Sequence, residues 1–217
     1  VIFIQDISGS MAGESLEQAI LGLEMGLKSL KYNDYFNIIV FNDGHSTYAD
    51  APIQATSEEI NKAINAIRHL SANGGTNVFS ALDYALSNQS ADNERLRQVV
   101  FLTDGDVGNE SQLFNLVSKK LGKSRLFTVG IGSAPNSYFM EKIAEIGRGE
   151  HIFIGSVYEV TQRMRELFAK IENPAITNLK IIFPNNEDVE YYPKILPDVY
   201  SGSPFEVSIR SNKEIQS

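Results

Sequence analysis

Residues 1–11, Val-Ile-Phe-Ile-Gln-Asp-Ile-Ser-Gly-Ser-Met, join an apolar run to a loop of oxygen-bearing side chains. An unbroken run of β-branched and aromatic residues predicts a strand that is buried on both faces, as in a parallel sheet covered by helices. Ligands of such folds bind beyond the carboxyl ends of the strands. The polar residues that follow this strand, Asp6, Ser8 and Ser10, are therefore candidates for a binding site.

Similar apolar runs recur at residues 36–41, 99–102 and 126–131, with a shorter one at 152–154. Between them, apolar residues at helical spacing predict helices at residues 16–30, 60–67, 78–87, 112–121, 138–146 and 160–171. A capping-box pair, Thr56 and Glu59, precedes the second helix. Residues 45–49, after the turn signal Asn42-Asp43-Gly44, are expected to form an antiparallel edge strand. The alternation predicts an α/β fold, a doubly wound, mostly parallel sheet flanked by helices.

The pattern changes after the last of these helices. Pro174 ends the helix, and residues 176–183 and 205–209 are predicted to be strands separated by turns rich in Pro and Asn. We therefore predict an α/β domain at residues 1–172 and a small β-rich C-terminal extension at residues 173–217. Because the chain begins directly with an apolar strand, without an initiator Met or a signal peptide, we expect it to be an interior fragment of a longer protein.

Composition excludes several classes of function. A formal net charge of -8 argues against nucleic acid as a partner, because binding to phosphates needs clustered Lys and Arg. No apolar run approaches the roughly 18 residues of a membrane-spanning helix, so no membrane insertion is expected. The absence of Cys excludes disulfides, thiolate zinc sites and thiol catalysis.

Two further polar positions join the three in the opening loop. Thr76 lies in Gly74-Gly75-Thr76-Asn77, at the start of a predicted helix, and Asp104 follows the strand at residues 99–102. All five candidates offer oxygen, as carboxylate or hydroxyl, and none offers sulfur or imidazole. Oxygen ligands select hard cations, and a few small ligands from separate loops suit Mg²⁺ better than a Ca²⁺ cage. The sequence thus predicts a Mg²⁺ site, with Mn²⁺ or Ca²⁺ as alternatives.

The Asp-x-Ser-x-Ser run, the separate Thr76 and the Asp of Phe101-Leu102-Thr103-Asp104-Gly105 resemble the metal-ion-dependent adhesion site of von Willebrand factor type A domains and integrin inserted domains. The resemblance covers about residues 1–170. It implies that Ser8, Ser10 and Thr76 touch the metal directly, while Asp6 and Asp104 act partly through water. It also implies that the metal captures an Asp or Glu side chain of a protein ligand.

A second, less specific resemblance is to the inter-α-trypsin inhibitor heavy-chain subgroup, especially its bacterial envelope members. It rests on residues 137–139 and 143–149, and on Tyr192-Pro193 and Leu196-Pro197-Asp198 in the tail. This resemblance implies that a β-rich domain precedes Val1 and that the C-terminal extension packs on it. It also implies an extracellular or cell-envelope location.

Plainer interpretations stand beside these. Asp6, Ser8 and Ser10 could be a helix cap with turn-forming serines, Thr76 a helix cap and Asp104 a strand-end turn residue. Gly130-Ile131-Gly132 suggests dinucleotide binding, but Pro135 stands where a third Gly is needed. His45, His69 and His151 lack the spacing of metal ligands and are expected to be surface or locally bonded residues.

Two alternatives to a noncatalytic binding module remain. A Mg²⁺-dependent phosphohydrolase would also have an Asp at the end of a strand, but it would need a second carboxylate two residues later, where Ser8 stands. A structural module with a metal site that stays empty is the other alternative. The absence of G-x-S-x-G argues against Ser-dependent hydrolysis.

Overall fold

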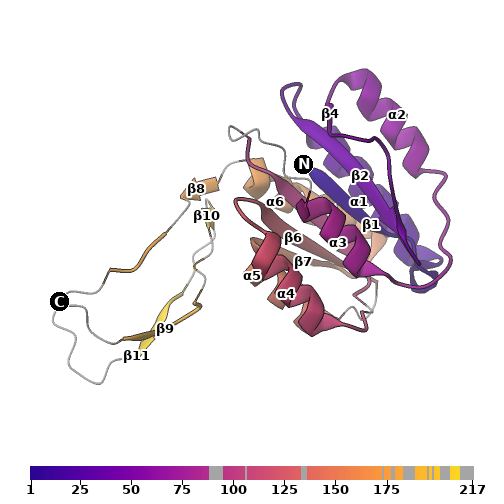
Figure 1. Cartoon of the computed structure of the whole chain (residues 1–217). Coiled ribbons are helices and arrows are strands. Elements are labelled where there is room, and N and C mark those ends of the chain that lie inside the picture. Colours follow the sequence, from indigo (N-terminus) through magenta and orange to yellow (C-terminus); the bar gives the residue numbers. More distant parts are fainter. Residues whose placement is uncertain are drawn as a thin grey trace.

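In a computed structural model, one central sheet is covered by helices on both faces (Figure 1). The structure describes residues 1–87, 95–105, 107–132, 136–172, 174–176, 179–182, 189–194, 196, 198–200 and 206–210. Among the described helices, none combines the length and the apolar character that crossing a bilayer requires.

Seven strands form the central sheet, in the order β3-β2-β1-β5-β6-β7, with β4 also pairing with β2. The strands are β1 (Ile2–Asp6), β2 (Tyr35–Phe41), β3 (His45–Thr47), β4 (Ile53–Gln54), β5 (Gln98–Thr103), β6 (Arg125–Ile131) and β7 (Arg148–Ile154). Only β3 and β4 run antiparallel to their neighbour β2, and the pairs β1–β2, β1–β5, β5–β6 and β6–β7 are parallel.

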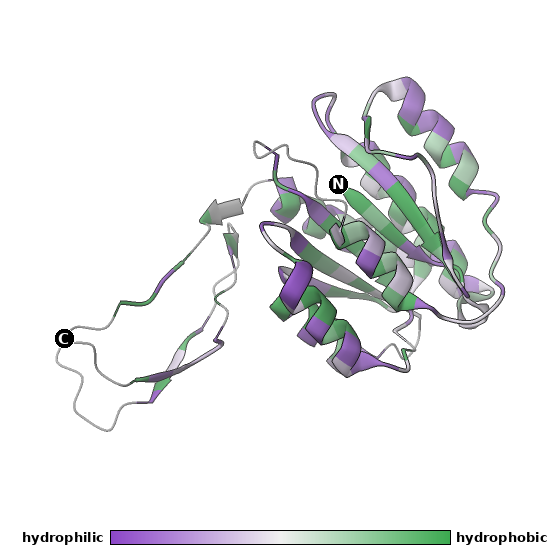
Figure 2. Ribbon diagram, viewed as in Figure 1, coloured by the Kyte–Doolittle hydropathy of each residue, from purple (hydrophilic) through white to green (hydrophobic). Residues whose placement is uncertain are grey.

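Helices connect these strands. They are the 3₁₀ helix η1 (Gly9–Met11) and the α-helices α1 (Glu14–Ser29), α2 (Ser57–Ile67), α3 (Val78–Ser87), α4 (Glu110–Lys120), α5 (Ser137–Ile146) and α6 (Val157–Glu172). Residues of α1, α2 and α6 form a core on one face of the sheet, and residues of α3, α4 and α5 form a core on the other. Figure 2 shows apolar strands in the middle, with helices of mixed polarity around them.

Burial on both faces explains the apolar strands. Phe3 on β1 lies 6.1 Å, between ring centroids, from Phe168 of α6. On the opposite face, the rings of Phe41 and Phe101 are 5.8 Å apart. All residues of β1 and β6 are buried. The fold class predicted from the sequence is thereby confirmed, together with its antiparallel edge strand β3.

Some boundaries differ from those predicted. β7 begins at Arg148 rather than at residue 152, and β4 was not predicted because two residues leave no periodic pattern. The capping box before α2 is half formed. Thr56 Oγ1 accepts a hydrogen bond from the Glu59 N–H (3.2 Å), but the Thr56 N–H donates to Gln54 O (2.8 Å).

The C-terminal extension contains two antiparallel pairs of short strands, β8 (Pro174–Ile176) with β10 (Val199–Tyr200) and β9 (Glu190–Tyr192) with β11 (Ser208–Arg210). The predicted strand at 176–183 is wrong for its described residues 179–182, which have no regular structure. Of these described residues, Leu179 and Ile181 are only half-buried and Ile182 is 87% exposed. β11 overlaps the end of the strand predicted at 205–209, of which Phe205 lies outside the described residues.

Although β9 and β11 stand away from the central sheet in Figure 1, residues of the extension contact the α/β core. Lys142 Nζ of α5 donates a hydrogen bond to Tyr192 Oη (3.4 Å). The Asp198 carboxylate accepts hydrogen bonds from Arg125, from Nε to Oδ2 and from Nη2 to Oδ1, the second at 3.0 Å. Both side chains are almost completely buried. The division at residue 172 remains a prediction, since β8 begins only two residues after the end of α6.

Two glycines of α1 provide a test of the packing between α1, the sheet and α6. A Cβ atom on Gly26 would lie 2.7 Å from Phe3 Cε1 and 2.8 Å from Phe168 Cζ, whereas a Cβ on Gly22 would have no neighbour closer than 3.5 Å. We expect Gly26→Ala to lower the free energy of unfolding by about 1–3 kcal/mol, because overpacking a core forces its neighbours apart.

Gly22→Ala is the matched control in the same helix. It should raise the free energy of unfolding by up to about 1 kcal/mol, since Ala is the better helix former and the added methyl group makes ordinary contacts. Urea titration of both variants measures these changes. A Gly26→Ala protein as stable as Gly22→Ala would contradict the close approach of α1 to β1 and α6.

Candidate metal centre

The candidate centre lies where the winding of the sheet reverses. From β1 the chain continues to β2 on one side, and later returns to place β5 on the other side of β1. Such a switch point leaves a crevice beyond the carboxyl ends of the two central strands. Asp6 is the last residue of β1, and Asp104 immediately follows β5, so the topology brings these two predicted residues to the same crevice.

The opening loop is ordered by its own side chains. The Asp6 Oδ1 atom accepts a hydrogen bond from the Ser8 N–H (2.8 Å), which turns the chain away from the sheet. The Ser8 and Ser10 hydroxyl oxygens lie 3.1 Å apart, and the buried side chain of Met11 anchors the end of the loop. Ser8 precedes η1 but makes no capping hydrogen bond with its side chain. The helix-cap part of the plainer interpretation is therefore wrong, whereas its turn-forming part agrees with the hydrogen bond from Ser8 to Asp6.

Thr103, the last residue of β5, connects the two strands. Its hydroxyl group donates to Asp6 Oδ2 (2.6 Å) and accepts from the Gly105 N–H (3.0 Å). Both carboxylate oxygens of Asp6 are thus held in place, one from each side. Sequence reasoning missed Thr103 as part of the site, although it stands directly before Asp104 in the quoted motif and offers a hydroxyl oxygen.

The loop with Thr76 is fastened to the opening loop by backbone hydrogen bonds. The Gly9 N–H donates to Gly74 O (3.0 Å), and the Asn73 N–H donates to Ile7 O (2.9 Å). Gly74 has a φ of 75°, and a Cβ atom there would lie 2.4 Å from Asp43 Oδ2, so the position requires glycine. These contacts bring Thr76, two residues later, to the same edge of the sheet.

Asp43 is a second residue that the sequence assigned only to a turn. Its Oδ1 atom accepts from the Gly75 N–H (2.9 Å), which fixes the residue before Thr76. Asn77, rather than Thr76, caps α3, because Asn77 Oδ1 accepts from the Ser80 N–H (3.2 Å). The interpretation of Thr76 as a helix cap is therefore wrong, and this residue is half-buried.

Burial dominates the electrostatics of this centre. It raises the pKa of the Asp6 carboxyl above its ordinary value, against the opposing effect of hydrogen bonds from Ser8 and Thr103. The negative charge of Asp104 raises this pKa further. An ionised Asp6 beside Asp104 is costly without a counter-charge, and a divalent cation would supply one.

The set of donors fits a hard cation. Topology and backbone hydrogen bonds bring two residues with carboxylates and three with hydroxyl groups to one edge of the sheet, at the ends of β1 and β5 and in the loop before α3. Oxygen donors of this kind suit Mg²⁺. Among the residues that the structure describes, no three His, Cys, Asp or Glu side chains form a group that could hold a metal ion. This centre has only two such residues, so its hydroxyl oxygens are essential to the metal interpretation.

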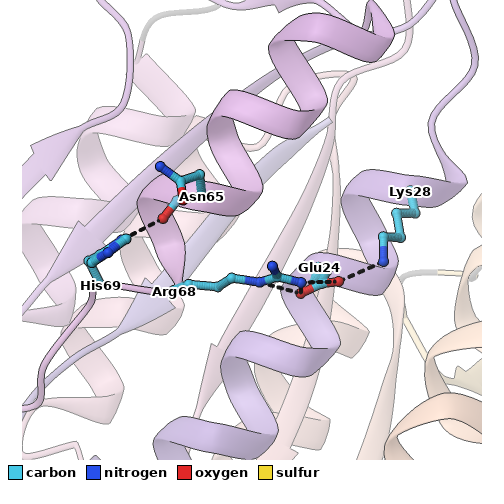
Figure 3. A network of polar contacts seen from close by, with 5 residues as sticks. All are labelled: Glu24, Lys28, Asn65, Arg68 and His69. Carbon is cyan, nitrogen blue, oxygen red and sulfur yellow. Dashed lines mark hydrogen bonds and ion pairs between the residues drawn. The ribbon is translucent and has the colours of Figure 1, made fainter.

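The histidines are engaged locally. His69 Nδ1 lies 2.7 Å from Asn65 O (Figure 3). The ring centroids of His45 and Tyr84 are 5.0 Å apart. His151 Nδ1 lies 3.0 Å from Thr128 Oγ1, and burial lowers the pKa of its imidazole. None of these contacts is with the five predicted site residues.

Comparison with known proteins identifies relatives. The family model for the von Willebrand factor type A domain matches residues 1–153. A von Willebrand factor A domain-containing protein of Dictyostelium discoideum is 31% identical over 181 residues, which are 83% of this chain and 19% of that protein. Inter alpha-trypsin inhibitor, heavy chain 4, of Mus musculus is 32% identical over 206 residues, which are 88% of this chain and 22% of that protein. The chain thus spans about a fifth of the length of these relatives.

Solved structures share the fold. A von Willebrand factor type A protein from Catenulispora acidiphila superimposes with a TM-score of 0.72 at 21% identity, covering 81% of this chain and 43% of that chain. A mutant of the PilB minor pilin from Streptococcus sanguinis gives a TM-score of 0.65 at 12% identity, covering 79% of this chain and 60% of that chain. The predicted resemblance to inter-α-trypsin inhibitor heavy chains is confirmed by the mouse relative, and membership of a bacterial envelope subgroup remains a prediction.

Proposed function

Since the chain belongs to the von Willebrand factor type A family, we propose that it is a noncatalytic module that uses a bound Mg²⁺ ion to capture an acidic side chain of a protein partner. The relatives indicate a protein-interaction module, and the metal dependence is our proposal. The residues proposed to hold the ion are Asp6, Ser8, Ser10, Thr76 and Asp104.

The observation that carries this proposal is the way Asp6 is held. One carboxylate oxygen accepts from the Ser8 N–H and the other from Thr103 Oγ1, so the side chain is fixed toward the crevice although burial disfavours its charge. Burying a carboxylate at this position costs folding free energy. Binding of a cation by this carboxylate would explain why Asp stands there.

The small number of carboxylates supports capture of an acidic ligand. The two carboxylates of Asp6 and Asp104 would equal the charge of a divalent ion, and the three hydroxyl groups would add oxygen ligands without further negative charge. Mg²⁺ prefers six oxygen ligands, so a position can be left for an oxygen of the partner. A carboxylate is the ligand that gains most from such an ion. Mn²⁺ or Ca²⁺ could replace Mg²⁺ at the same oxygens.

Catalysis has less support. The position two residues after Asp6 has the hydroxyl group of Ser8, and not the second carboxylate that covalent phosphoryl transfer would need. We also propose, from the family resemblance alone, a location outside the cell or in the cell envelope, and a preceding β-rich domain on which the C-terminal extension packs.

Isothermal titration of the full chain with Mg²⁺ tests the proposed metal centre. We expect a single saturable site in the unaltered protein, and at least about a tenfold loss of affinity in Ser8→Ala/Ser10→Ala, because two oxygen ligands are removed. Ser118→Ala, an exposed hydroxyl on α4, is the control and should bind like the unaltered protein. Equal Mg²⁺ binding by the double variant would place the ion elsewhere and refute the proposed centre.

A further inference from the structure

Further carboxylates lie along the edge of the sheet that bears the candidate centre, and uncharged groups hold them in place. Four of them lie in the turns and first helical turns at the carboxyl edge of the sheet, and each accepts a hydrogen bond from an uncharged donor. They are Glu14 (from Gln18 Nε2, 3.0 Å), Asp43 (from Gly75 N, 2.9 Å), Glu110 (from Asn136 Nδ2, 2.7 Å) and Glu159 (from Gly155 N, 3.2 Å). These four carboxylates are called the acidic rim below.

In the described structure no basic residue pairs with the acidic rim. The described segments at this edge, residues 7–17, 42–45, 71–77, 104–105, 107–110, 132, 136–138 and 155–159, contain neither Lys nor Arg. Within the described part of the chain, none of the four carboxylates is ion-paired. The carboxylates of the rim are therefore oriented by hydrogen bonds, but not by ion pairs.

Several carboxylates elsewhere in the domain have basic partners. Glu24 accepts from Lys28 (2.6 Å) and from both Nε and Nη2 of Arg68 (Figure 3). Away from the carboxyl edge, further pairs join Glu172 to Lys31, Asp83 to Lys120 and Glu150 to Lys170. Asp50 and Glu141 are also not ion-paired in the described structure, so the rim is distinguished by the grouping of its four carboxylates at one edge of the sheet.

Helix dipoles explain only part of this distribution. An acidic residue in the first turn of a helix is stabilised by about 0.3–1 kcal/mol, which accounts for Glu14, Glu110 and Glu159. Asp43 lies in the turn between β2 and β3, where no helix begins. Nor does a dipole prevent a nearby Lys or Arg on an adjoining loop from pairing with these carboxylates.

Aromatic side chains lie at the same edge. The second residue of α3, α5 and α6 is aromatic in each case, and these residues, Phe79, Tyr138 and Tyr158, are 36%, 66% and 93% exposed. Tyr138 follows shortly after Asn136, whose N–H donates to Asp104 O (3.3 Å). Exposed aromatic rings beside polar groups are typical of interaction surfaces and attract cations to their faces.

On the premise of the metal-dependent capture proposed above, we propose that the partner presents its acidic side chain within a basic segment. The carboxylate of the partner binds the metal, while flanking Lys or Arg side chains pair with the acidic rim and lie against the rings of Tyr138 and Tyr158. A segment with further acidic residues would be repelled, because the rim charges act within the Debye length of about 8 Å at physiological salt. The rim therefore selects the charge around the captured residue.

Two synthetic peptides of nine residues test this inference with the full chain. Both have one central Glu in a Gly and Ser background. One has two Arg on each side of the Glu, and the other has Gln at those four positions. In Mg²⁺ and low salt we expect the Arg peptide to bind at least about tenfold more tightly, since several exposed charge pairs of up to about 1 kcal/mol each combine. The difference should shrink at 0.5 M NaCl, an ionic strength of about 500 mM, where screening is stronger.

Matched variants locate the effect. Glu14→Gln/Glu159→Gln should reduce the preference for the Arg peptide by at least about threefold. Glu150→Gln/Glu172→Gln removes the same charge from residues outside the acidic rim and should preserve the preference. Equal reduction in both double variants would overturn the inference, because net charge alone would then explain it.

The remaining outcomes separate this inference from the proposed function. If both peptides bind equally in Mg²⁺ and neither binds in EDTA, the metal-dependent capture stands and the selective rim is refuted. If the Arg peptide binds equally well in EDTA, or with its Glu changed to Gln, both proposals fail, because the metal is then not used. If neither peptide binds, the inference is refuted, and Mg²⁺ titration alone decides on the metal centre.

Discussion

Asp6→Asn is expected to abolish the stabilisation of the chain by Mg²⁺. An ion that binds only the folded state raises its stability by RT ln(1 + [L]/Kd), about 2.7 kcal/mol at 100 times the Kd, and Asn lacks the charge that makes the ion bind. Thermal unfolding with and without Mg²⁺ measures the effect. The variant should unfold at the same temperature in both conditions, whereas the unaltered chain should unfold several degrees higher with Mg²⁺.

Without the metal the same variant should be at least as stable as the unaltered chain. Because burial raises the pKa of Asp6, the folded state binds its proton more tightly than the unfolded state does. Stability from this group is therefore present at acidic pH and is lost as the pH rises through the raised pKa. Asn carries no charge and avoids this loss at neutral pH.

The side-chain shape at position 6 is nearly preserved in Asn, which can still accept from the Ser8 N–H. Asp83→Asn on α3 is the control, because its pairing with Lys120 is partly exposed and remote from the candidate centre. Two results would count against this account: a Mg²⁺-induced shift that persists in Asp6→Asn, or a metal-free Asp6→Asn protein that is strongly destabilised.

Removal of Asp198 is expected to cost about 3–5 kcal/mol of folding stability, because it leaves the Arg125 guanidinium buried without its counter-charge. Arg125 also donates from Nη1 to the carbonyl oxygens of Lys123 (2.9 Å) and Ser124 (3.2 Å), so the group is fixed and cannot turn toward water. Urea unfolding of Asp198→Ala, followed by circular dichroism, measures the loss.

The double variant Arg125→Met/Asp198→Leu is the comparison for Asp198→Ala, since replacing a buried ion pair with apolar residues of similar volume is often neutral or stabilising. We expect the double variant to regain most of the stability lost in Asp198→Ala. If Asp198→Ala is as stable as the unaltered chain, the Arg125–Asp198 pair does not hold the extension on the α/β core.

The α/β core could be predicted because its signals are local. Strands such as β1 and β5 are buried on both faces and therefore show unbroken apolar runs, and each lies between helices with one apolar face. Strand order was not read from these runs. The position of β5 beside β1, which creates the crevice, depends on contacts between residues about a hundred positions apart.

The sequence predicted the five residues of the candidate site but not the residues whose hydrogen bonds hold them in place. The five oxygen-bearing residues stand out because their types and positions match a known motif. Thr103 and Asp43 do not, because each acts through a residue distant in sequence: Thr103 on Asp6, and Asp43 on Gly75. Hydrogen bonds of this kind are set by the tertiary fold, and no pattern along the chain encodes them.

In the C-terminal extension the same apolar pattern predicted a strand over residues 179–182, which have no regular structure. Leu179, Ile181 and Ile182 have the apolar character of a strand, but Ile182 is largely exposed and nothing in the described structure pairs with residues 179–182. Strand propensity reflects fit to a half-buried surface. Where the surface is missing, composition alone does not produce a strand.

The contact between Arg125 and Asp198 has a mechanical consequence. Arg125 begins β6 at the amino edge of the sheet, whereas the candidate metal centre lies at the carboxyl edge. If a partner binds at that centre as proposed, tension between the partner and residue 198 would run along the strands. Parallel ladders join β1 to β5 and β5 to β6. Such tension would load each ladder in shear, so that its hydrogen bonds would resist together instead of opening one at a time.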